Sequence, residues 1–525
     1  MNVDQARLSD DTAELKNIIF SLQSIQEKNQ SRIEFLEERI RLLQKELFGR
    51  RTEKPPKEDQ HQLLLFDEAD EPEPELEKVT VPAHTRKKRG RKPLPEELPR
   101  VDVVLDIPDD EKICGCGCEL SHIGDDTSEK LEIIPAKVQV IRYIRKKYAC
   151  KNCEGVEDEG PTVRIAPLPP QIIPKSIATP GLLAHIIVSK FEDALPFYRQ
   201  EKILQRMGID LPRSTLCNWA VKMADRIEPI MSLLHDEIRS GPLINIDETP
   251  VQVLKEPGRS NTSKSYMWIY RGGDPDKPVL LFQYHPTRSG DVPLTFLDGY
   301  RGYIQTDGYA GYDALSRRNG IELVGCWAHA RRKFMKVINA KSGKKKKGIA
   351  DKAINTIGRL YAIEKQAREK QLSLDGIYRL RQEEAKPILT KFHNWLLLKS
   401  DITPPKGLLG NAIQYTLKNW DRLIRYMNNG HLRPDNNLAE NAIRPFVIGR
   451  KNWLFSGSPN GARASSALYS LIETAKANGL EPYRYLRYLF ARLPYIENDA
   501  AYVNLLPTKI DPQVIDRFLE SGAIY

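Results

Sequence analysis

The sequence predicts a multidomain α/β protein in which a mixed sheet carrying a helical insertion follows several smaller regions. Three observations predict this. Short apolar runs such as 243–246, 279–284 and 321–324 have the length and β-favouring residues of buried strands. Helical pattern then dominates from about residue 333 to residue 427. A heptad pattern near the N-terminus predicts a further helix outside the sheet.

Length and charge limit the classes of function. A chain of 525 residues has room for roughly three or four domains. It has 80 Lys and Arg residues against 70 acidic ones, and this net charge of +10 favours an anionic partner such as nucleic acid. An apolar run long enough to cross a membrane and a signal-peptide pattern are both absent from the sequence. We therefore expect a soluble, cytoplasmic protein without a membrane partner.

Residues 1–49 contain the heptad pattern. Position a holds Ile19, Gln26, Ile33, Ile40 and Leu47, and position d holds Leu15, Leu22, Asn29, Leu36 and Leu43. Mostly Ile at a with Leu at d is typical of a two-stranded parallel coiled coil, so we expect a homodimer or a higher oligomer. The alternative is one amphipathic helix that packs on its own globule.

Residues 50–100 have the composition of a flexible linker, with an acidic block at 67–75 and a basic block at 86–93. The basic block has an Arg-Gly-Arg sequence of the kind that enters narrow minor grooves of DNA. This interpretation makes Arg89, Arg91 and Lys92 candidate DNA contacts. A solvated run of charges would have the same sequence.

Five of the seven cysteines lie in the region 101–160. Cys150 and Cys153 form a C-x-x-C pair, and Cys114, Cys116 and Cys118 precede them by about thirty residues. Two thiolate groups at such a spacing indicate a structural Zn²⁺ site with four ligands. The spacing does not decide which two of the first three cysteines bind. A redox C-x-x-C is the alternative, and the sequence offers no βαβ setting for it.

Residues 161–240 predict a helical domain. Helical segments at 195–207 and 213–222 flank the turn Gly208-Ile209-Asp210. This is the layout of a helix-turn-helix, whose second helix enters the major groove, and it makes Arg213 a candidate DNA contact. A small helical bundle without DNA contacts is the alternative.

The region 241–455 contains three carboxylates in informative places. Asp247 follows a strand that Thr249-Pro250 is expected to stop, and Asp307 follows the strand 302–306. Glu440 lies on a short helix that Asn437 is expected to cap. Three converging carboxylates form a site for hard divalent cations. Taken singly, the three also fit a strand end, an Asp-Gly turn and a capping box.

Basic and aromatic residues after Glu440 suggest a groove for a nucleic-acid strand. The segment 449–458 supplies the candidates Arg450, Lys451 and Trp453. A lysine-rich run at 341–347 suits phosphate contact or simple solvation. We expect the tail, residues 456–525, to be a helical packing element.

Together these motifs resemble the large transposase of the insertion-sequence-66 family over nearly the whole chain. The motifs that carry the resemblance include Asp247-Glu248-Thr249, the segments 306–312 and 326–334, and the segment 437–445 with its Gly449–Trp453 continuation, and they are specific in combination. The resemblance implies a ribonuclease-H-like fold with a DDE triad of Asp247, Asp307 and Glu440 that holds two Mg²⁺ or Mn²⁺ ions. It also implies an accessory pair, Cys326 and His329, and further DNA contacts at Arg331, Arg332, Lys333 and Arg444. The C-x-C-x-C cluster departs from the family's simple C-x-x-C.

The resemblance implies a function as well. Such a protein binds the terminal repeats of its element and target DNA in the bacterial nucleoid, with small accessory proteins as possible helpers. Water first cleaves at the element's end, and the freed 3′-hydroxyl then attacks target DNA. One alternative is a DNA-binding regulator or architectural protein with an inactive ribonuclease-H-like domain. Another is a nuclease without strand transfer.

Overall fold

A computed structural model describes residues 138–149, 163–165, 167–340 and 348–523, with thirteen positions between residues 20 and 40. The chain divides into two compact units: Glu68–Leu168 is one, and Met1–Asp67 with Pro169–Tyr525 is the other. Among the helices described, none is long and apolar enough to cross a membrane. The linker candidates Arg89, Arg91 and Lys92, the five clustered cysteines and the lysine-rich run 341–347 lie outside the described residues.

The described positions between residues 20 and 40 are all helical, as the heptad pattern predicts. Their apolar side chains are exposed: Phe20, Leu22, Ile25, Ile33, Leu36 and Ile40. Coverage of these side chains by a second copy of the helix stays a prediction.

The smaller unit contributes one short antiparallel ladder to the described part of the chain. Strand β1 (Lys147–Ala149) pairs with β2 (Val163–Ile165), with Tyr148 opposite Arg164. In sequence, Cys150 comes directly after β1 and Cys153 follows three positions later.

Helices α3 to α6 precede the sheet: α3 (Pro180–Phe191), α4 (Phe197–Arg206), α5 (Arg213–Arg226) and α6 (Glu228–Ser240). The predicted helix, turn and helix are confirmed at this level, and α4 packs against α5. Gly208 lies in the turn with a φ of 79°, a conformation that glycine adopts without strain. Helix α6 packs on β4 and β5 through an apolar face that includes Ile230 and Leu234.

The central sheet has the predicted mixed character. Its strands are β3 (Leu243–Val253), β4 (Lys264–Asp274), β5 (Lys277–His285), β6 (Gly302–Gln305), β7 (Ile321–Val324) and β8 (Phe455–Ser456). Their order is β5-β4-β3-β6-β7, and β8 pairs with the end of β3. Strands β3, β4 and β5 are antiparallel, whereas β3, β6 and β7 are parallel. Helix α7 (Asp291–Phe296) and the 3₁₀ helix η3 (Ala310–Arg317) connect them.

The prediction that Thr249-Pro250 stops the first strand is wrong, because β3 continues to Val253 and Asp247 lies within it. The carbonyl of Pro250 accepts a hydrogen bond from Arg450, so it faces away from β4. In an antiparallel strand the N–H points to the same side as the carbonyl of its residue. The backbone nitrogen of Pro250 therefore also faces away from β4, and its lack of a hydrogen does not interrupt the hydrogen bonds between β3 and β4.

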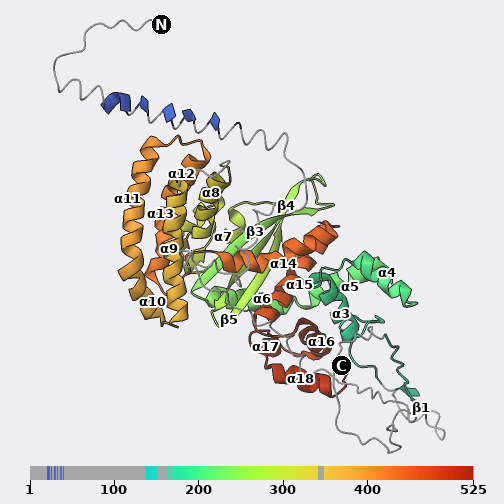
Figure 1. The fold of residues 1–525 in the computed structure, drawn as a ribbon. Coiled ribbons are helices and arrows are strands. Elements are labelled where there is room, and N and C mark those ends of the chain that lie inside the picture. The colour runs from blue at the N-terminus through green and yellow to red at the C-terminus, as the bar shows by residue number, and fades with distance from the viewer. Residues whose placement is uncertain are drawn as a thin grey trace, which may run out of the picture. The chain divides into compact units, whose positions relative to one another are not determined.

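The predicted helical insertion begins at Trp327, slightly before the expected residue 333. It comprises α8 (Trp327–Asn339), α9 (Ile349–Glu369), α10 (Leu374–Leu380), the π-helical turn η4 (Arg381–Ala385), α11 (Lys386–Ile402), α12 (Leu408–Lys418), α13 (Trp420–Ile424) and η5 (Arg425–Asn428). These helices form a bundle beside the sheet (Figure 1), with their own core around Phe334, Leu360 and Phe392.

One charged side chain lies inside that bundle. Arg381 is 2% exposed and forms a two-pronged ion pair with Glu364. Its remaining donors reach the carbonyls of Tyr426, Asn429 and Leu432 at 2.7 to 2.9 Å. Arg381 therefore joins the bundle to the segment through which the chain returns to the sheet.

The chain ends in α14 (Asn437–Trp453), α15 (Pro459–Ala477), α16 (Pro482–Arg492), η6 (Leu493–Tyr495), α17 (Asp499–Val503) and α18 (Pro512–Glu520). Helix α15 covers β5, the edge strand of the sheet. Thr474 exchanges hydrogen bonds of 3.0 Å with the backbone of Leu280, and Ser470 accepts one of 2.7 Å from Phe282. These hydroxyls satisfy backbone groups that an uncovered edge would expose.

Candidate active site

The parallel pairing of β3 and β6 brings Asp247 and Asp307 to neighbouring positions where β6 ends. Asn245 is paired with Gln305, and each aspartate lies two residues further along the sequence. The carboxylate of Asp247 accepts a 2.9 Å hydrogen bond from the backbone N–H of Glu248. That of Asp307 accepts one of 2.9 Å from the N–H of Tyr309.

Glu440 lies in the first turn of α14, which packs against β3. The prediction that Asn437 caps a short helix is wrong: Asn436 holds the capping position, and α14 runs 17 residues through Pro445. The side chain of Asn436 makes no cap hydrogen bond, because it is used elsewhere. Its amide donates to the carbonyl of Ile246 at 2.8 Å.

Three buried amides connect the three segments that carry the carboxylates. The Asn245 amide donates to Gln305 Oε1 and to Asn436 Oδ1, both at 3.0 Å. Gln305 in turn donates to the carbonyl of Arg433 at 2.7 Å. Asn245, Gln305 and Asn436 are each at most 1% exposed. The network thus fixes β3, β6 and the start of α14 relative to one another.

The carboxylates interact electrostatically. Burial raises the pKa of Asp247 well above its ordinary value, and the charges of Glu248, Glu440 and Asp307 raise it further. Burial also raises the pKa of Asp307 and that of Glu440, and Arg332 opposes both increases. Carboxylates that destabilise one another's charged forms are a suitable donor set for a divalent cation, which removes this repulsion. The residues therefore fit the Mg²⁺ or Mn²⁺ that the family resemblance implies.

Glu248, the neighbour of Asp247, is held by partners of its own. Its side chain is 1% exposed, pairs with Arg288 and accepts a hydrogen bond from Tyr312. The Arg288 guanidinium lies 3.7 Å from the centre of the Tyr309 ring. No sequence motif marks Arg288, because it lies in a loop and meets Glu248 only through the fold.

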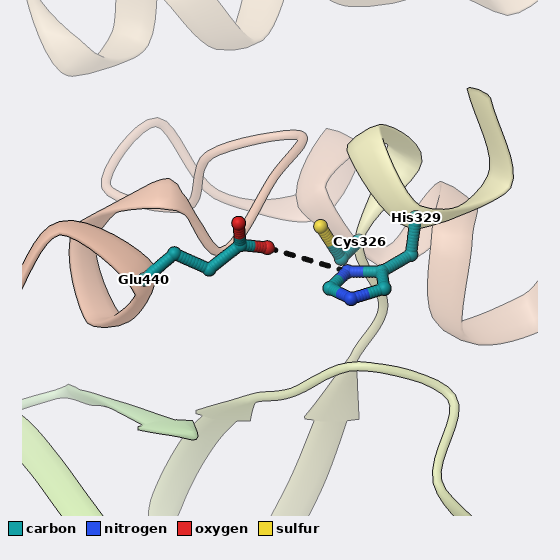
Figure 2. A group of neighbouring side chains, drawn as sticks. All are labelled: Cys326, His329 and Glu440. Carbon is teal, nitrogen blue, oxygen red and sulfur yellow. Dashed lines mark ion pairs between the residues drawn. The ribbon is translucent and has the colours of Figure 1, made fainter. Parts of the chain in front are cut away.

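The accessory pair lies beside Glu440. Cys326 precedes α8 and His329 lies in its first turn, and Figure 2 shows both side chains directed toward Glu440. His329 Nδ1 is 3.4 Å from Glu440 Oε1, while Arg332 pairs with Oε2 of the same carboxylate. Burial, together with the charges of Arg332 and Lys333, lowers the pKa of His329 to about 3, so the ring is neutral. Burial raises the pKa of the Cys326 thiol.

The other described DNA candidates occupy different settings. Arg213 is exposed at the start of α5, and Lys451 is exposed near the end of α14. Lys333 lies 4.5 Å from the centre of the Tyr415 ring. Arg331 and Arg444 are half-buried. DNA contact by these residues stays a prediction.

Arg450 and Trp453 make contacts within the protein. Arg450 donates to Thr249 Oγ1 at 3.0 Å and to the Pro250 carbonyl, so it fastens α14 to β3. The Trp453 ring packs edge-on against Phe446 at 5.3 Å. Both side chains therefore stabilise the fold, and a role in DNA contact would come in addition.

Models of known families match most of the chain. The "Transposase IS66 family" model matches residues 175–464, which include the sheet, the insertion and all three carboxylates. The models "Transposase C of IS166 homeodomain", "zinc-finger binding domain of transposase IS66" and "IS66 C-terminal element" match residues 35–103, 111–154 and 470–508. The zinc-finger match includes all five clustered cysteines and supports a zinc-binding region there.

Two similar proteins come from Sinorhizobium fredii (strain NBRC 101917 / NGR234). The uncharacterized protein y4jD is 34% identical over 412 residues, which cover 76% of this chain and 78% of the relative. The uncharacterized protein y4qI is 29% identical over 533 residues, covering 98% and 95%. On these matches, the chain belongs to the IS66 family of transposases, for which DNA is the implied partner.

Proposed function

We propose that the chain is the DNA transposase of an insertion sequence and that Asp247, Asp307 and Glu440 are its DDE triad. In this proposal the protein binds the element's ends and catalyses metal-dependent strand cleavage and strand transfer. The observation that carries the proposal is the linked placement of the three carboxylates. They come from β3, β6 and α14, and buried amides join these segments within a few residues of each carboxylate.

A ribonuclease-H-like fold is part of the proposal. Its support is the sheet order, in which three antiparallel strands, β5, β4 and β3, continue into the parallel strands β6 and β7. The first two carboxylates lie on or directly after the neighbouring central strands β3 and β6. The third lies on a helix that packs against β3.

The chain's own residues suit the proposed roles. Asp247 lies on β3, which has β6 on one side and α14 packed against it, so it is the carboxylate placed to be shared. Arg288 and Tyr312 bind the carboxylate of Glu248, so Asp247 is the member of the acidic pair that we assign to the cation. Divalent cations bound there would activate the attacking oxygen and stabilise the leaving oxygen.

Two reactions follow in the proposal. Water attacks the phosphodiester at the element's end, and the bond to the 3′-oxygen breaks to leave a free 3′-hydroxyl. That hydroxyl then attacks a phosphodiester of target DNA and displaces the 3′-oxygen of the target strand, so neither reaction needs a covalent bond to the protein. The basic side chains Arg332 and Lys333 lie near Asp307 and would face the anionic DNA strand.

The N-terminal regions have supporting roles in the proposal. The exposed apolar side chains of the first helix suit a two-stranded coil, which would bring together two copies of the chain. The clustered cysteines would hold one structural Zn²⁺, and the Arg-Gly-Arg segment would contact DNA. The proposal also includes small accessory proteins of the same element as partners, and the family resemblance is its basis for them.

Strand-transfer assays with labelled element ends and Mg²⁺ test the proposal. Asp247→Asn, Asp307→Asn and Glu440→Gln should each abolish cleavage while retaining binding to the ends. Persistent cleavage in all three variants would refute the triad. Cleavage without joined products would indicate a nuclease, and binding without either reaction in the wild-type protein would indicate a DNA-binding regulator.

A further inference from the structure

Cys326, His329 and Glu440 bring three different donor atoms to one point beside the proposed triad. One ligand atom from each residue lies within 4.8 Å of the other two, as Figure 2 illustrates. Cys326 is 1% exposed and Glu440 is 6% exposed. The cluster joins the start of α8 to the first turn of α14, so two separate elements hold it in place.

Two of the facing atoms have no hydrogen-bond partner. Glu440 Oε1 and His329 Nδ1 are both buried and unsatisfied, although they lie 3.4 Å apart. The other oxygen of Glu440 is paired with Arg332. A buried carboxylate oxygen without a donor is costly, and it is directed toward the thiol and the imidazole. A bound cation would satisfy it without displacing Arg332 from the other oxygen of Glu440.

We propose that Cys326, His329 and Glu440 bind one transition-metal ion of the zinc type through sulfur, nitrogen and oxygen. This proposal deepens the proposed function, because Glu440 is one of the triad carboxylates. Thiol and imidazole ligands select Zn²⁺ or Co²⁺ over Mg²⁺, which prefers oxygen. Three protein ligands leave a fourth tetrahedral position open, as in catalytic zinc sites.

Metal binding requires two proton changes, and the structure accommodates them. The Cys326 thiol releases its proton to solvent on coordination. Arg332 Nη1 lies 3.1 Å from His329 Nε2, which places the imidazole proton on Nδ1 in the metal-free protein. Coordination through Nδ1 moves that proton to Nε2, and Arg332 then leaves Nε2 while keeping its pair with Glu440. The competing interpretation is that Nδ1–H only orients Glu440.

Asp247 and Asp307 offer only oxygen ligands, whereas Glu440 lies beside the sulfur of Cys326 and the nitrogen of His329. The Glu440 end of the carboxylate cluster therefore differs from the aspartate end in ligand chemistry. An ion at the Glu440 end is expected to exchange with Zn²⁺ or Co²⁺. An ion between the aspartates is expected to be Mg²⁺ or Mn²⁺. The two positions would then respond differently to the same chelator.

Cobalt substitution in the full-length protein tests the site without relying on catalysis. Protein that a chelator has stripped of metal is titrated with Co²⁺, and the sulfur-to-cobalt charge-transfer absorption and the bound equivalents are measured. The wild-type protein should bind one equivalent more than Cys326→Ser and should show an additional band that this variant lacks. His329→Gln, which keeps the thiol, should weaken Co²⁺ binding at least about tenfold.

Cys217 provides the matched control, because it is the other free cysteine in the described part of the chain and is exposed on α5. Cys217→Ser should retain the wild-type spectrum, and the clustered cysteines contribute equally to all variants. Identical spectra and stoichiometry in the wild type and Cys326→Ser would overturn the site. Asp247→Asn should abolish cleavage but keep the band, so the spectrum tests the site and the cleavage assay tests the triad.

Discussion

The Asn245 amide donates a 3.0 Å hydrogen bond to Asn436 Oδ1, although the two residues are 191 positions apart. Both side chains are buried, and the same Asn245 amide also reaches Gln305. Each of the three residues lies shortly before one of the triad carboxylates. The geometry of the proposed site therefore depends on polar side chains that are not ligands themselves.

Replacing Asn245 by Leu should slow strand cleavage by about 10²-fold, because a misplacement of about 1 Å at a reacting centre has that effect. The loss should appear in the rate at saturating Mg²⁺, with a smaller change in DNA affinity. Single-turnover cleavage measures it. Asn355, which is exposed on α9, gives the control Asn355→Ala, and equal rates for the two variants would contradict a positioning role.

Asp247→Asn should make the metal-free protein more stable at high pH. The folded-state pKa of Asp247 is raised by burial and by neighbouring carboxylates. The folded wild type therefore loses stability as the pH rises from the unfolded value of about 3.9 through the folded pKa. The amide is uncharged throughout, so the variant should have the higher Tm at about pH 8 and little advantage near about pH 4.

Melting curves in a chelator, at both pH values, check this expectation. Added Mg²⁺ should raise the Tm of the wild type more than that of the variant, because cation binding stabilises the folded state. A Tm difference that does not change with pH would show that the Asp247 charge is not the cause.

Arg381→Met should destabilise the helical insertion by about 3–5 kcal/mol, because it leaves the half-buried Glu364 without its partner and three carbonyls without their buried donor. The double variant Arg381→Met with Glu364→Leu should recover part of the loss. Urea unfolding measures both. The exposed Arg379 offers the control Arg379→Met, for which a change of about 0.5 kcal/mol or less is expected.

Serine substitutions in the cysteine cluster should show which of its five cysteines bind zinc. Cys150→Ser and Cys153→Ser should each lose the ion held there, since four ligands are needed. Of Cys114→Ser, Cys116→Ser and Cys118→Ser, two should lose it and one should keep it, and zinc content measures this. Retention in all three would mean that the cluster supplies ligands interchangeably. Loss of this ion should leave the melting of the catalytic unit unchanged.

The sequence predicted the elements that carry the carboxylates better than their surroundings. Apolar runs identified β3 and β6, and their parallel pairing explains why Asp247 and Asp307 lie together. The cap of α14 was misassigned because Asn436 uses its side chain to bind β3, which local spacing cannot reveal. Arg288 was missed for the same reason: its partner Glu248 lies 40 positions away in the chain.

The third carboxylate also explains when this site can first exist. Glu440 and Asn436, the amide that bonds Asn245, come late in the chain, whereas Asn245 and Asp247 come before its midpoint. A polypeptide still emerging from the ribosome therefore has both aspartates but lacks the glutamate. The site cannot be complete until the whole insertion has been synthesised and the chain has returned to the sheet, so truncated products of translation should be inert toward DNA strands.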